Sequence, residues 1–93
     1  MQPQELNLFD ERRRIERKLL EKLKSAEHDY RSAVADFKSL SEQSKDLGLE
    51  HPDGRQAIRN AVAIERAAMQ KYQAALRAFT DFVVSGIKPP ADE

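Results

Sequence analysis

The segment GLEHP, residues 48–52, separates two long stretches whose patterns are strongly helical. Glycine readily adopts the left-handed conformation that ends many helices, and proline suits the first turn of the helix that follows. Gly86 repeats this stop signal and is followed within four residues by two prolines. We therefore predict a helix over residues 5–47, a turn at 48–52, a second helix over 53–85 and a frayed tail at 88–93.

Apolar or small residues follow one another along the first predicted helix at alternating steps of four and three. This spacing keeps one seam facing a neighbouring helix over its whole length, as in coiled coils. Two starting points are open, with Pro3 as the first helical residue or Asn7 as the capping residue. The seam consists of Leu19, Leu23, Ala26, Tyr30, Ala33, Phe37, Leu40, Ser44 and Leu47.

The second predicted helix has two adjacent apolar stripes, which is more than contact with one helix requires. We expect the first stripe to pack on the first helix and the second to remain uncovered in a lone hairpin. The first stripe is Ala57, Ala61, Ile64, Ala68, Tyr72, Ala75, Phe79 and Phe82, and the second is Ile58, Val62, Met69, Leu76 and Val83.

Two helices alone cannot enclose a core, and a large exposed apolar patch usually marks an interaction surface. The sequence thus predicts an all-α fold, a long antiparallel helical hairpin that dimerises into a four-helix bundle. Peripheral packing in a monomer, a higher oligomer, a different protein partner and a domain-swapped rod remain alternatives. The residues predicted to form the dimer interface are Leu20, Val34, Ile58, Val62, Met69, Leu76 and Val83.

The first helix is predicted to overhang the second by about ten residues at 1.5 Å per residue. Leu6, Leu8 and Phe9 lie on this overhang and are expected to be exposed in a monomer. They form a possible partner-binding segment. Glu65 is the other unusual position, because it falls within the apolar arc of the second helix, and we predict a buried or edge-solvated polar residue that sets register.

Composition limits the function more than it defines it. The chain has 93 residues, enough for one domain over 1–93, and its 16 basic and 16 acidic residues give no net charge. Each third of the sequence is also neutral, so long-range attraction to nucleic acid is not expected. There is no cysteine and no apolar run long enough for a signal peptide or a bilayer span, so we expect a cytoplasmic protein without membrane contact.

No catalytic, metal-binding or cofactor-binding motif is found in the sequence. A di-iron bundle site needs Glu-x-x-His, but serine and glycine stand three residues before His28 and His51. A hairpin that closes near residue 50 places His28 level with Tyr72. The basic cluster Arg12–Lys18 is interleaved with acidic residues at helical spacing, which is typical of a solvated, salt-bridged surface.

These patterns favour a non-enzymatic helical interaction module, a small homodimeric adaptor or scaffold that binds another protein through helix surfaces. An alternative is a holding chaperone for a secreted or assembling protein that uses the overhang as a hydrophobic hook. A weaker alternative is nucleic-acid binding through Arg12–Lys18.

Overall fold

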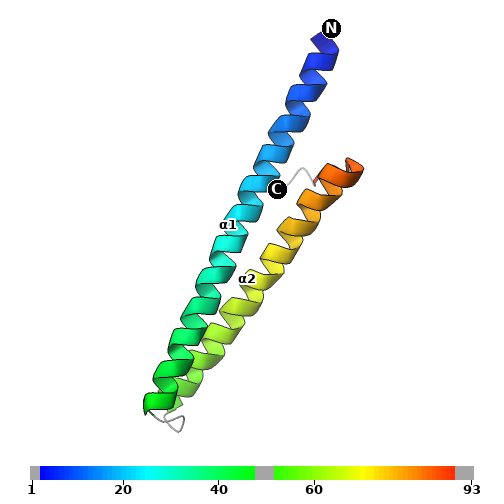
Figure 1. Ribbon diagram of the computed structural model, residues 1–93. Helices are drawn as coiled ribbons and strands as arrows, with labels where there is room; N and C mark the ends of the chain where they lie inside the picture. The colour runs from blue at the N-terminus through cyan, green and yellow to red at the C-terminus, as the bar shows by residue number, and fades with distance from the viewer. Residues whose placement is uncertain (1–2, 48–51, 90–93) are drawn as a thin grey trace.

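The chain forms two long antiparallel helices that pack side by side as a hairpin (Figure 1). The computed structural model describes residues 3–47 and 52–89. α1 spans Pro3–Leu47 and α2 spans Pro52–Ser85. The predicted antiparallel hairpin is therefore confirmed. Residues 48–51, which hold most of the predicted turn and its Gly48 cap, lie outside the described residues.

The start of α1 and the end of α2 follow from the backbone preferences of proline and glycine. Of the two starting points considered above, the structure has Pro3 as the first residue of α1, where the missing N–H of proline costs no helical hydrogen bond. α2 ends before Gly86, whose φ of 71° is left-handed. The Gly86 N–H donates to the Phe82 carbonyl at 2.9 Å, and the Ile87 N–H donates to the Asp81 carbonyl at 3.2 Å. These bonds satisfy carbonyls that the end of the helix would otherwise leave free.

The molecule is a rod of 69 × 19 × 18 Å. α1 has 45 residues and α2 has 34, so α1 is longer by about 16 Å at the usual helical rise. The N-terminal part of α1 extends beyond the end of α2 (Figure 1). The two helices touch only along one side each, and a rod this thin has little interior.

The core is correspondingly small. Among the described residues, Leu19, Ala33 and Phe82 are the buried hydrophobic side chains, and no large side chain is completely enclosed. All three belong to the seam or stripe that the sequence predicts to lie between the helices. Most other residues of this contact are only half-buried.

A stacked aromatic pair shows the register of the hairpin. The rings of Tyr30 and Tyr72 lie 5.9 Å apart between centroids, with planes at 14° to each other. His28 is two residues from Tyr30, or about 3 Å along the rod, so its predicted level with Tyr72 is right to within one helical turn. His28 is exposed, because it lies well away from the Tyr30 side of α1 at 100° per residue.

The segment after α2 turns back onto α1. Lys88 Nζ lies 3.5 Å from Glu11 Oε1, and Pro89 is half-buried beside Leu19. Residues 88 and 89 thus contact α1, whereas the sequence predicts that fraying begins there. The rest of that predicted tail, residues 90–93, lies outside the described residues.

Candidate functional site

One side of the hairpin carries large apolar residues from both helices, and we call it the apolar face. On α2, Val62, Met69, Leu76 and Val83 recur every seven residues and so stay on one side of the helix, with Ile58 beside them. On α1, Leu20 and Val34 are two heptads apart. The apolar face comprises Leu20, Val34, Ile58, Val62, Met69, Leu76 and Val83.

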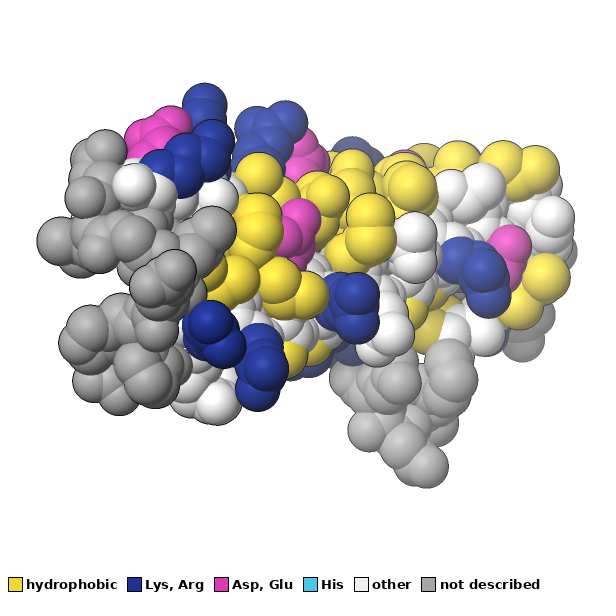
Figure 2. Space-filling model, turned by 90° about the horizontal axis from the view of Figure 1, so that it is seen from below, with side chains coloured by type: hydrophobic (Ala, Val, Ile, Leu, Met, Phe, Trp, Pro, Cys, Tyr) yellow, Lys and Arg dark blue, Asp and Glu magenta, His cyan; other side chains and the backbone are white. Residues whose placement is uncertain are grey.

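These side chains are only partly covered by the hairpin itself. Leu20, Ile58 and Val62 are half-buried. Val34, Met69, Leu76 and Val83 are exposed, with Met69 at 42% and Leu76 at 44%. Figure 2 shows hydrophobic side chains gathered along the length of the molecule. The residues predicted for an interface therefore lie on one side of the hairpin, which leaves them partly or fully exposed.

Two glutamates lie within the apolar face. Glu27, midway between Leu20 and Val34 on α1, forms an ion pair with Arg31. Glu65 lies between the levels of Val62 and Met69 on α2 and is half-buried. No ion pair or hydrogen bond of the Glu65 side chain is found within the described ranges. Glu65 is therefore an edge-solvated carboxylate that a covering partner would have to satisfy or leave hydrated.

Basic side chains border the apolar face on both sides, and we call these rows the basic margins. Lys24, Arg31 and Lys38 recur every seven residues along the outer edge of α1. On the outer edge of α2 the corresponding residues are Arg59 and Arg66, also seven residues apart. All five are exposed. Lys and Arg side chains are visible on both sides of the hydrophobic run in Figure 2.

Charge counted along the chain does not reveal these margins. Each third of the sequence is neutral, yet five of the 16 basic residues lie next to one face when the helices are viewed end-on. The signal that could have revealed them is the seven-residue recurrence of cations on each helix beside the apolar positions.

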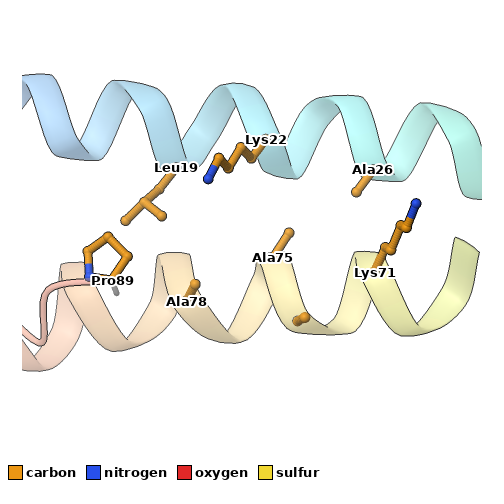
Figure 3. A pocket seen from close by; sticks show the side chains of 8 residues that line it. Leu19, Lys22, Ala26, Lys71, Ala75, Ala78 and Pro89 are labelled. Atoms are coloured by element: carbon orange, nitrogen blue, oxygen red, sulfur yellow. The ribbon is translucent and has the colours of Figure 1, made fainter. Parts of the chain in front are cut away.

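The opposite side of the hairpin is different, since small residues line a shallow groove between the helices. Figure 3 shows one part of it, where Leu19 and Ala26 of α1 face Ala75 and Ala78 of α2. The Lys71 side chain extends from α2 toward α1. A row of small residues alone is not a site for any particular ligand.

Ile64 lies along this groove, and its predicted burial against α1 is wrong. It was placed in the stripe of α2 that packs on α1, but its side chain is 62% exposed. The α1 residues that line the groove next to it include Ala33, Asp36 and Ser39. These side chains are too short or too polar to cover an isoleucine.

The N-terminal overhang presents two apolar side chains to solvent. Leu8 is 66% exposed and Phe9 is 59% exposed. The Arg13 guanidinium lies 5.5 Å from the centre of the Phe9 ring, within cation–π range. The side chain of Leu6, the third residue of the predicted partner-binding segment, lies outside those described.

The basic cluster Arg12–Lys18 is divided between two sides of α1. At 100° per residue, Arg13, Arg14, Arg17 and Lys18 lie within about 140° of one another. The Arg12 guanidinium lies 6.0 Å from the centre of the buried Phe82 ring, on the inner side of the helix. Nucleic-acid binding through this cluster stays a prediction.

Metal-ligand clusters, membrane-spanning helices and similarity to known proteins were also considered. Over residues 3–47 and 52–89, no three His, Cys, Asp or Glu side chains lie close enough together to hold a metal ion. Within the same residues, neither helix has an apolar stretch that could span a bilayer. No protein-family model, curated protein or solved structure matches the chain.

Proposed function

We propose that this protein is a non-enzymatic helical interaction module, a small adaptor or scaffold that packs helices of another chain against its apolar face. The observation that carries the proposal is the row of partly or fully exposed apolar side chains on one side of the hairpin, interrupted by Glu27 and Glu65. Exposed apolar surface of this kind is energetically unfavourable in water and is relieved when a partner covers it.

The homodimeric four-helix bundle predicted from the sequence is the simplest assembly of this type. Two hairpins packed face to face would bury Met69, Leu76 and their neighbours from both copies. The 11 additional residues of α1 would then project from the bundle at each end or lie across the other subunit.

Sedimentation equilibrium tests this assembly. At protein concentrations of about 10–100 µM and about 0.5 M NaCl, where repulsion between exposed charges is screened, we expect twice the chain mass of 10.6 kDa. A chain that is folded by circular dichroism and sediments as a monomer at the highest concentration would contradict the homodimer.

A holding chaperone is the second candidate, and the exposure of Leu8 and Phe9 favours it. The variant Leu8→Ser/Phe9→Ser should lose suppression of aggregation of heat-unfolded citrate synthase, while the helical content stays unchanged. Substitution is preferable to removal of residues 1–14, because that deletion would also remove the Glu11–Lys88 ion pair and the Arg12–Phe82 contact. If the doubly substituted chain protects the client as well as the native chain does, the overhang is not a chaperone hook.

A further inference from the structure

We propose that the preferred occupant of the apolar face is an amphipathic helix of another protein, with acidic residues on both sides of its apolar stripe. This inference rests on the proposed function, since it names the partner class for the same face. It is carried by the basic margins, which border the face along both helices.

The charge pattern of the face is complementary to such a helix. A helix lying between α1 and α2 on the apolar face would pass close to Lys24, Arg31 and Lys38 on one side and to Arg59 and Arg66 on the other. The Tyr30–Tyr72 pair places these two rows at overlapping levels of the rod. Acidic residues flanking the partner's apolar stripe would therefore meet cations on both sides.

A second copy of the chain fits this pattern less well. A two-fold axis along the rod places the α1 margin of each copy next to the α2 margin of the other. A two-fold axis across the rod places each margin next to its own counterpart. Both arrangements bring basic margins together, so self-association by this face is opposed by charge at low ionic strength.

Glu65 adds a feature that fixes position along the rod. Its half-buried carboxylate would be covered when a helix docks, and a buried carboxylate requires a partner. One basic residue within the apolar stripe of the partner would supply it and would set the register. The same carboxylate, together with Glu27, makes the centre of the face unfavourable for insertion into a lipid bilayer.

The length of the partner helix follows from the length of the face. Residues 58–83 of α2 span about 37 Å at the helical rise, which corresponds to a docked helix of about 25 residues.

Two designed peptides provide the test. Each has about 25 residues, leucine at heptad positions a and d, and one lysine at a central a position. The first has glutamate at positions e and g, and the second has lysine there; like charges at these positions keep either peptide from pairing with itself. At about 0.1 M NaCl, we expect fluorescence anisotropy to show binding of the glutamate peptide about tenfold or more tighter than the lysine peptide.

Charge reversal on the protein identifies the groups responsible. The variant Arg59→Glu/Arg66→Glu should remove the preference of the protein for the glutamate peptide. The matched control is Lys18→Glu/Lys71→Glu, which changes net charge equally on the side of the hairpin away from the face. The control should keep the preference for the glutamate peptide.

Several outcomes would overturn the proposal. Equal binding of both peptides, weakened equally by Met69→Glu/Leu76→Glu, would leave the docking face intact but remove the acidic specificity. Binding that this double variant does not change would remove the face itself, and with it the proposed function. Failure of the glutamate peptide to bind would reject the acidic helix as occupant. Displacement of that peptide by anionic phosphatidylserine vesicles or duplex DNA, or a dimer at about 0.05 M NaCl that the peptide does not dissociate, would do the same.

Discussion

Replacement of Phe82 by alanine should lower the free energy of unfolding by about 3–5 kcal/mol, the usual cost of deleting a buried aromatic ring. Phe82 is 3% exposed and is the largest of the buried side chains of the hairpin. Its ring also contacts the Arg12 guanidinium of α1, so truncation removes both apolar burial and a cation–π contact. Since domains of this size are stable by only about 5–10 kcal/mol, much of the cooperative transition should be lost.

Urea and thermal denaturation followed by circular dichroism measure this effect. Val84→Ala is the matched control, because Val84 lies two residues away on the same helix and is 77% exposed, and it should change stability by about 0.5 kcal/mol or less. Phe82→Leu retains most of the apolar volume, so its free energy of unfolding should lie between those of the Phe82→Ala and Val84→Ala variants. Equal stability of the alanine variant and the native chain would show that the packing of Phe82 on α1, at the open end of the hairpin, is not formed in solution.

The double substitution Met69→Glu/Leu76→Glu should weaken self-association by about 100-fold or more, equivalent to about 2.7 kcal/mol. The reason is that each glutamate would be covered by apolar side chains of the partner without a compensating charge. In the hairpin alone both positions are more than 40% exposed, so the stability of the monomer should change by about 1 kcal/mol or less. Sedimentation equilibrium at about 0.5 M NaCl separates these two effects.

Ala63→Glu/Gln70→Glu is the control for charge. Both positions are exposed and lie on the side of α2 that faces away from the apolar face, so association should persist. If the control dissociates the assembly as strongly as the face variant does, net charge and not contact at Met69 and Leu76 determines association.

The hairpin could be predicted because the signals that begin and end its helices are local in sequence. Pro3 can begin a helix and Gly86 can end one through their own backbone preferences, whatever packs around them. The seam residues Leu19 and Ala33 follow from spacing alone. The row of interface positions on each helix also follows from spacing, whereas the alignment of the two rows on one side of the hairpin depends on how the helices pack.

The remaining details depend on how one helix sits against the other. Ile64 belongs to the inner stripe by sequence periodicity, yet small shifts in rotation and register bring it next to short α1 side chains and leave it exposed. The pairing of Tyr30 with Tyr72 depends on the geometry of the turn, which sequence spacing gives only to within a few residues. The contact of Lys88 with Glu11 requires knowledge of where the chain runs after Gly86.

The small number of enclosed side chains has a consequence for how such a molecule persists in solution. Within the described ranges, the buried apolar residues are Leu19, Ala33 and Phe82. Because so little apolar surface is buried, we expect the free energy of unfolding of the free hairpin to be small. Ligand linkage then makes the folded fraction rise with the concentration of whatever covers the apolar face. We expect the unbound chain to be cleaved readily by proteases and the bound chain to survive, so that its abundance follows that of its companion.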